Sequence, residues 1–329
     1  MTLMYQYQQT QRFFAQIARG MEELGAEELT DLGARNIAPA YRGLYFDADQ
    51  AALYRINYGS RLVTRVLAPL TAFQCHNPDY LYRTARSVQW TDFMTVDHTF
   101  AVFANVSNSK IRHSKYAALR VKDAVVDTFR EQCGRRPSVD TRHPHVWINL
   151  YIENNRATLS LDTAGGSLHR RGYRQQTGSA PMQETVAAAV IRLSGWQGER
   201  PLVDPMCGSG TLLAEALMHY CRIPAGYLRR HFGFEALPDF DETVWAAVRR
   251  EADEQMRPLP AGLIAGSDAS AEAIAAARTN MRTLPYGEHV ALSVRAYQDR
   301  EDLEGVTLIS NPPYGIRVGR KETIGDFYK

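Results

Sequence analysis

Residues 201–213 read PLVDPMCGSGTLL and decide the fold of the C-terminal half of the chain. A short apolar strand ends at Asp204, and Gly208 and Gly210 supply a tight turn into a helix that begins near Thr211. Glycine lets the backbone approach a ligand closely, and a helix N-terminus offers free N–H groups and the positive end of its dipole. The stretch therefore predicts a loop that binds a nucleotide-like cofactor beyond the end of a strand.

This loop differs from the phosphate loops that bind triphosphates. No lysine follows its glycines, and the full GxGxxG fingerprint is absent. A nucleoside that carries an amino acid therefore fits better, with Asp204 holding its ammonium group. Asp268 ends the next apolar strand, GLIAGSD, and can accept the ribose hydroxyls. The interval between these acids far exceeds the usual spacing of roughly 20 residues, which predicts an inserted helical segment.

Short strands and helices alternate through the whole region after Pro201. The expected strands are PLVDP, GLIAGSD, VALSVRA and VTLISNPP, with helices around 211–221, 241–256 and 270–283. This alternation predicts an α/β domain with a parallel, doubly wound sheet and a ligand beyond the carboxyl ends of its strands. Because the sequence ends soon after the fourth strand, we expect this domain to be truncated at its C-terminal end.

A second motif, Asn311-Pro312-Pro313-Tyr314, directly follows the apolar strand VTLIS. An exocyclic amine on an aromatic base is a poor nucleophile, because its lone pair is delocalised into the ring. The Asn311 side-chain carbonyl and the Pro312 backbone carbonyl can accept its two N–H bonds, and proline presets the backbone directions. Tyr314 offers a ring for stacking on the base. The motif predicts an amine acceptor site that faces a methyl donor and works by orientation and electrostatics.

Two α+β regions precede this domain. The first, from about Phe13 to Leu70, contains a strand, a helix that ends at Gly33, a second strand, and then a helix followed by a strand. The second contains the strand HTFAVFANV, an amphipathic helix that ends at Gly134, and a hairpin with its turn at 153–155. The stretch 164–180, rich in Gly, Ser and Arg, is the expected linker. The helix after it is predicted to bury the stripe Met182, Val186, Val190 and Leu193.

Composition limits the class of protein and of partner. The chain has 329 residues, 45% of them hydrophobic and 22% charged, which is ordinary for a soluble globular protein of two or three domains. A formal charge of +2 means that a nucleic acid must be held by local basic patches. The four cysteines lack ligand spacing, so we expect reduced thiols in the cytoplasm and no metal. Neither a signal peptide nor a membrane span is evident.

Basic side chains gather around the start of the helix near residue 114 and in the expected linker. With aromatic neighbours, such clusters suit phosphate contacts and base stacking. The predicted RNA-binding residues are Lys110, Arg112, His113, Lys115, Arg170, Arg171 and Arg174. One alternative is that both clusters are solvated surface, and another is that the linker cluster packs the two halves of the chain together. His143 and His145 share a strand face, but no third ligand is evident, so they do not predict a metal site.

Several segments carry a resemblance to a known family. These are GMEELGAEEL, SRLVTRVL, HRRGYR followed by APMQE, DPMCGSGTLLAEA, ARTNMR and SNPPYG. The C-terminal part resembles a class I, Rossmann-like, S-adenosylmethionine-dependent methyltransferase of the NPPY type. A region like a THUMP RNA-binding domain precedes it, with a ferredoxin-like segment ahead of that. From about Phe13 to the end, the chain is most similar to the bacterial 23S rRNA guanine-N2 methyltransferases.

The resemblance implies a domain plan and a set of site residues. The expected boundaries are 1–70 for the ferredoxin-like segment, 71–165 for THUMP, 166–182 for the linker and 183–329 for the incomplete methyltransferase domain. The implied cofactor-binding residues are Asp204, Met206, Cys207, Gly208, Gly210, Thr211 and Asp268. The family tends to carry an acid after its third strand, where Ala296 or Tyr297 stands here, so Asp299 is expected to substitute. The residues expected to face the base are Asn311, Pro312, Pro313 and Tyr314.

The leading hypothesis is an enzyme that uses S-adenosylmethionine to methylate the N2 amine of a guanine in 23S ribosomal RNA. A transfer-RNA guanine-N2 methyltransferase and an adenine-N6 methyltransferase remain alternatives, because the same motifs suit them. A non-catalytic RNA-binding protein is a further alternative from a different class. The expected partner is 23S or another structured RNA, without a membrane or a metal.

Overall fold

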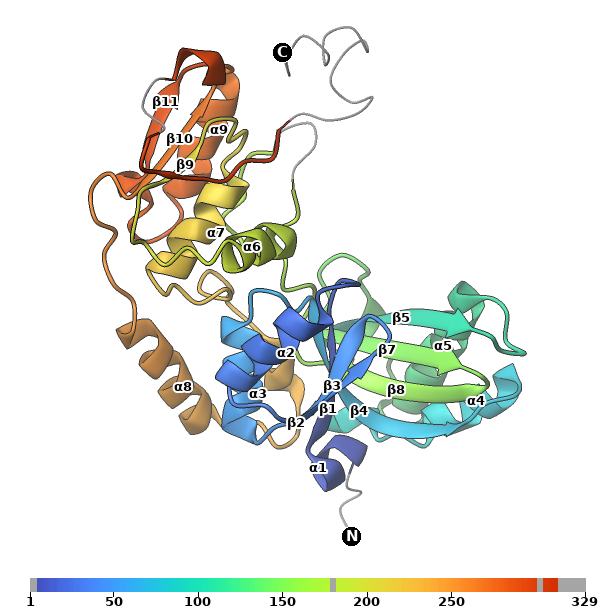
Figure 1. The fold of residues 1–329 in the computed structure, drawn as a ribbon. Coiled ribbons are helices and arrows are strands. Elements are labelled where there is room, and N and C mark those ends of the chain that lie inside the picture. The colour runs from blue at the N-terminus through green and yellow to red at the C-terminus, as the bar shows by residue number, and fades with distance from the viewer. Residues whose placement is uncertain (1–4, 178–181, 301–303, 313–329) are drawn as a thin grey trace, which may run out of the picture. The chain divides into compact units, whose positions relative to one another are not determined.

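The computed structural model describes residues 5–177, 182–300 and 304–312, and Figure 1 shows their arrangement into helices and strands. The chain divides into two compact units. The first unit contains residues 1–168 and 229–250, and the second contains 169–228 and 251–329. Each unit has a sheet of its own.

The first unit is built on an eight-stranded sheet with the order β2-β3-β1-β4-β8-β7-β5-β6. Its helices and strands are α1 (Gln6–Thr10), β1 (Arg12–Gln16), α2 (Glu22–Asp31), β2 (Arg35–Ala40), β3 (Gly43–Asp47), α3 (Gln50–Gly59), β4 (Arg65–Gln74), α4 (Pro78–Arg86), β5 (Thr99–Ser107), α5 (Ser114–Cys133), β6 (Ser138–Val139), β7 (Val146–Glu153) and β8 (Arg156–Asp162). Strand β4 pairs antiparallel with β1 on one side and with β8 on the other. It therefore joins the two predicted α+β regions into one continuous sheet.

Most elements of this unit agree with the sequence prediction. The helix α5 ends at Gly134, whose φ of 66° is the left-handed conformation that glycine adopts readily. The β7–β8 turn contains Asn154 and Asn155, both with positive φ, as a tight hairpin turn requires. Strand β2 was missed, because RNIAPA is half exposed and lacks a clear apolar alternation.

Residues 229–250 return to the first unit and fill an aromatic cluster beside α3. The Tyr54 and Phe234 ring centroids are 4.4 Å apart, and Trp245 lies 5.3 Å from Tyr58 and 5.1 Å from Phe234. The Tyr54 hydroxyl accepts a hydrogen bond from the backbone N–H of Asp241 at 3.0 Å. The predicted insertion between Asp204 and Asp268 is thus partly a structural piece of the N-terminal sheet unit.

The second unit contains a four-stranded parallel sheet with the order β11-β10-β9-β12. Its helices and strands are α6 (Glu184–Leu193), β9 (Leu202–Asp204), α7 (Thr211–Tyr220), β10 (Ile264–Asp268), α9 (Ala271–Met281), β11 (Ala291–Val294) and β12 (Thr307–Leu308), while α8 (Glu242–Glu254) runs across the division between the units. This alternation confirms the predicted parallel α/β fold. The core packs Leu202 and Ile264 from the strands against Leu213 and Leu217 of α7.

The predicted apolar stripe along α6 is only partly buried, because Met182 and Val190 pack against the core while its other two residues are exposed. Val186 and Leu193 are 36% and 72% exposed, whereas Ala187, Ala188 and Ile191 are buried. Small alanine side chains let α6 lie close against α7, so the alanine face enters the core in place of Val186 and Leu193. In the described part of the chain, none of the helices is long and apolar enough to cross a membrane.

We predict that Gly233→Ala destabilises the first unit. A Cβ atom at residue 233 would lie 2.0 Å from the carbonyl oxygen of Asp162 and 2.7 Å from the backbone nitrogen of Gly165, so backbone must move. Overpacking of this kind costs about 1–3 kcal/mol, measurable as a lower free energy of unfolding in urea. The control is Gly59→Ala in α3, where a Cβ would meet only the flexible end of Leu32 at 3.1 Å. Equal stability of the two variants would contradict the prediction.

Candidate cofactor and acceptor site

The parallel register of β9 and β10 brings two predicted acids to one edge of the sheet. Asp204 pairs with Gly266, so Asp268 extends just beyond it on the neighbouring strand. The loop after β9 folds back over β10, where the Cys207 N–H donates to the Ser267 carbonyl at 2.9 Å. The Gly208 N–H donates to Asp268 Oδ2 at 3.0 Å. The sequence-distant acids and the glycine loop therefore form one connected site.

Glycines shape this loop for different reasons. At Gly266 a Cβ would lie 2.4 Å from Leu213 Cδ1 and 3.3 Å from Cys207 Cβ, so a larger residue would push the Leu213 side chain aside and crowd the loop over β10. Gly208 and Gly210 have φ of 52° and 84°. No atom lies within 4 Å of a Cβ built at Gly208. The backbone is thus open at Gly208, as the approach of a ligand requires.

Asp204 is the buried acid of the site, and its surroundings change its pKa. It is 1% exposed, and its Oδ1 accepts hydrogen bonds from the Met206 N–H at 3.1 Å and the Ser310 hydroxyl at 2.8 Å. Burial raises the pKa of Asp204 to about 7, and the nearby Asp268 adds to this, while the two hydrogen bonds oppose it. A buried carboxyl with this pKa suits a cationic ligand group, because the cation stabilises its ionised form.

Ser310 connects the acceptor motif to the cofactor loop, and the sequence prediction did not include it. Strand β12 pairs with β9 on the side away from β10, and the Ile309 N–H donates to the Val203 carbonyl at 3.0 Å. The next residue, Ser310, then bonds Asp204, so Asn311 and Pro312 follow at the same sheet edge. Pro313 and Tyr314, the other predicted acceptor residues, lie outside the described residues.

The other predicted cofactor residues occupy positions around this edge. Met206 and Cys207 lie in the loop, and burial raises the pKa of the Cys207 thiol, which is therefore unreactive. Thr211 begins α7, and its hydroxyl accepts a hydrogen bond from Arg174 at 3.1 Å. Asp299 is exposed in a short turn after β11, where its carbonyl accepts from Arg295 Nε at 3.0 Å.

The predicted RNA-binding residues separate into exposed and buried groups. Lys110, Arg112, His113 and Lys115 are all exposed before and at the start of α5, and Arg170 is exposed in the second unit. The Arg171 side chain is 0% exposed and pairs with Glu215, and Arg174 is largely buried beside Glu184. Their positions do not fit the predicted contact with RNA, because buried and paired guanidinium groups are unavailable to phosphates. The prediction of an exposed linker rested only on the Gly-, Ser- and Arg-rich composition of residues 164–180.

Metal-binding side chains do not converge within the described ranges, where no group of three or more His, Cys, Asp or Glu residues could hold an ion. The His145 ring nitrogen Nδ1 instead lies 2.9 Å from the Thr99 hydroxyl.

Comparison with known proteins matches three successive parts of the chain. Residues 171–329 match the RMKL-like methyltransferase domain, 75–162 the THUMP domain and 12–67 the RlmL ferredoxin-like domain. A Synechocystis sp. protein named "Putative RNA methyltransferase" is 41% identical over 97% of this chain and 84% of its own length. The chain belongs to the RMKL-like methyltransferase family. This membership confirms the resemblance, the fold class and the predicted cofactor, S-adenosylmethionine.

Two further relatives extend the family comparison. The Ribosomal RNA large subunit methyltransferase K/L of Syntrophotalea carbinolica is 41% identical over 96% of this RMKL-like chain, which spans only 46% of that protein. A solved structure described as "a putative methyltransferase complexed with SAH" (S-adenosylhomocysteine, the demethylated cofactor) is 30% identical. The two structures superpose with a TM-score of 0.83, and the match covers 96% of this chain and 84% of the solved chain.

We predict that S-adenosylhomocysteine binding weakens in acid. Asp204 has a pKa of about 7 in the free protein, and in the expected binding mode only its ionised form would attract the ligand's ammonium group. Affinity is then full well above pH 7 and falls by about tenfold between pH 8 and pH 6. Isothermal titration calorimetry across this range measures the effect. The Asp204→Asn variant should bind weakly with a flat profile, and a flat wild-type profile would refute the role of Asp204.

Proposed function

We propose that this chain transfers a methyl group from S-adenosylmethionine to the N2 amine of a guanine in 23S ribosomal RNA, in the cytoplasm. When bound, the cofactor supplies an electrophilic methyl group. The observation that carries the proposal is the Ser310–Asp204 hydrogen bond of 2.8 Å, because Asn311 and Pro312 directly follow Ser310 at the edge that holds the cofactor loop. The name of the Syntrophotalea relative supports large-subunit ribosomal RNA as the substrate.

Asn311 and Pro312 would hold the acceptor amine. In the proposed site, the Asn311 side-chain carbonyl and the Pro312 backbone carbonyl accept the two amine N–H bonds, and the lone pair then points at the methyl donor. The Pro312 ring fixes its own φ, which limits the directions open to these carbonyls. The rate gain comes from orientation within a partly buried site, without a covalent intermediate.

The cofactor loop would bind the donor through backbone and acid groups. In this proposal, Asp204 neutralises the ammonium group, and Asp268 accepts the ribose hydroxyls with the lone pairs not used by the Gly208 and Ser270 N–H groups. Both loop glycines have positive φ, so the backbone itself can lie against the ligand.

The first unit would hold the RNA through the exposed patch Lys110, Arg112, His113 and Lys115, which we call the α5 basic patch. Its loop is anchored to the β7–β8 turn, because the Asn155 side chain accepts the Lys110 N–H at 2.8 Å and lies 3.2 Å from the Ser109 hydroxyl. A fixed loop presents its cations at low entropic cost. The match of residues 75–162 to the THUMP domain supports this surface.

We predict that Asn311→Ala strongly lowers turnover while both ligands still bind. Loss of one oriented acceptor should lower kcat by about a hundredfold or more. The assay follows labelled methyl transfer to unmodified ribosomal and transfer RNA, with nucleoside identification after digestion. Exposed Asn105→Ala is the control. N2-methylguanosine in 23S RNA alone supports the proposal, whereas label in transfer RNA or on adenine favours the corresponding alternative enzyme. Unchanged turnover in Asn311→Ala contradicts the assigned role.

We predict that removing the α5 basic patch weakens RNA binding without affecting the cofactor. The variant Lys110→Ala/Arg112→Ala/Lys115→Ala loses three cations, so the slope of log affinity against log salt should fall by roughly 2–3. The matched control is Arg130→Ala/Arg135→Ala, two exposed arginines of the same unit that already pair with Asp127 and Asp97. Equal RNA affinity for the two variants, measured by filter binding at several salt concentrations, would argue against this surface.

A further inference from the structure

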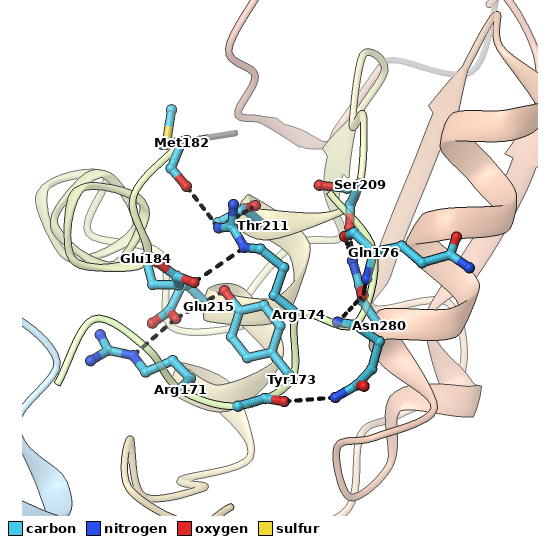
Figure 2. Close-up of polar contacts among 12 residues, drawn as sticks. Arg171, Tyr173, Arg174, Gln176, Met182, Glu184, Ser209, Thr211, Glu215 and Asn280 are labelled. Atoms are coloured by element: carbon cyan, nitrogen blue, oxygen red, sulfur yellow. Dashed lines mark hydrogen bonds and ion pairs between the residues drawn. The ribbon is translucent and has the colours of Figure 1, made fainter. Parts of the chain in front are cut away.

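The stretch Arg171–Gln176, expected to be part of a linker, is an internal element of the second unit. Arg171 and Tyr173 are buried against the α7 residue Glu215, as Figure 2 shows. Arg171 Nε lies 3.2 Å from Glu215 Oε1, and the Tyr173 hydroxyl donates to the same oxygen at 3.3 Å. The stretch is thus anchored in the core before it reaches the cofactor loop.

Arg174 connects this stretch to one end of the loop. Its Nη2 donates to the Met182 carbonyl at 2.7 Å and to the Thr211 hydroxyl at 3.1 Å, and its Nε lies 3.2 Å from Glu184 Oε1 (Figure 2). Thr211 directly follows the glycine loop as the first residue of α7. A planar guanidinium group reaches these three oxygens at once, which the point-like ammonium group of lysine cannot do.

Asn280, on α9, connects the same stretch to the middle of the loop. Its Oδ1 accepts the N–H groups of Gln175 and Gln176 at 2.8 and 3.0 Å. Its Nδ2 donates to the carbonyls of Gln176 at 2.9 Å and of Ser209 at 3.0 Å. The side chain is 1% exposed and uses its full set of amide donors and acceptors. Ser209 itself lies between the two positive-φ glycines.

We propose that Arg174 and Asn280 are positioning residues that hold the cofactor loop in its binding conformation from outside the strand-loop-helix motif. The inference rests on the proposed role of this loop in binding S-adenosylmethionine. Glycine gives the loop wide conformational freedom, and binding would have to remove that freedom. The hydrogen bonds to Ser209 and Thr211 restrict the loop before the ligand binds. Binding then costs less conformational entropy, so the affinity is higher.

The charges of the cluster favour a geometric role over a purely stabilising one. Arg171 and Arg174 are balanced by Glu184 and Glu215, and burial raises the pKa of Glu184. Buried ion pairs of this kind contribute little net stability compared with apolar packing, because desolvation offsets their attraction. Paired guanidinium groups do orient the residues that they bond. Arg174 bonds Thr211, which begins the helix after the loop.

The neighbouring arginine supplies a matched control for the test. Arg171→Lys and Arg174→Lys make the same substitution in the same cluster. Arg174 bonds Thr211 at the end of the loop, whereas Arg171 pairs with Glu215, one turn further into α7. For full-length protein we expect Arg174→Lys to raise the KM for S-adenosylmethionine and the Kd for S-adenosylhomocysteine by about tenfold, the effect of one or two lost hydrogen bonds. Its kcat at saturating donor and its RNA affinity should stay within about twofold of wild type, because the lost hydrogen bonds hold the cofactor loop and not the acceptor motif or the α5 basic patch.

A readout without ligand separates this inference from the proposed function. Hydrogen exchange of the amides of residues 207–213 should be faster in Arg174→Lys and Asn280→Ala than in wild type, and unchanged in Arg171→Lys. All four proteins are compared below their unfolding temperatures, measured by circular dichroism. If wild type fails to bind S-adenosylhomocysteine, the proposed function fails, while loop exchange still decides the positioning role.

Two results would overturn the inference. The first is equal loop exchange in Arg171→Lys and Arg174→Lys, with only a shared loss of thermal stability. The second is donor binding in Asn280→Ala that matches wild type, since this variant removes the Ser209 contact entirely. Faster exchange together with raised KM, confined to the two loop-contacting positions, supports it.

Discussion

The parallel hydrogen bonding of β9 with its neighbours is the constraint on which the proposed chemistry depends. On one side, β10 places Asp268 beside Asp204. On the other side, β12 places Ser310 and Asn311 at the same edge. Carboxyl ends of parallel strands meet at one edge by geometry, so residues far apart in sequence converge without any further device. A shift of one residue in either ladder would turn these side chains away from the site.

The site combines open backbone with closely packed support. Gly208 faces free space, whereas a Cβ at Gly266, beneath the loop, would meet the Leu213 and Cys207 side chains. The support is polar as well as apolar, since the loop residues Ser209 and Thr211 are held by Asn280 and Arg174. The loop backbone is therefore free to contact a ligand where it is exposed, at Gly208. Elsewhere in the loop, hydrogen bonds and packing hold the backbone in place.

Local patterns predicted most of the strands, the longer helices and the two acids, because each depends on residues close together in sequence. Asp204 and Asp268 were found from their places at strand ends, and the α5 and β7–β8 boundaries from Gly134 and a pair of asparagines. Long-range partners were not predictable in this way. Arg171 resembles a solvated linker residue until Glu215, on a helix far along the chain, is placed against it. The alanine face of α6 was also missed, because burial there follows from the close approach of α7 and not from the size of its side chains.

The return of residues 229–250 to the first unit affects the order in which the protein can fold. Tyr54 and Tyr58 gain their aromatic partners Phe234 and Trp245 only from this late segment. During synthesis, the N-terminal sheet therefore emerges from the ribosome well before the rings that complete its core. Its final closure must wait until much of the second unit has also been translated. The two units are thus linked in time as they fold, because residues 169–228 of the second unit are made before the segment that completes the first.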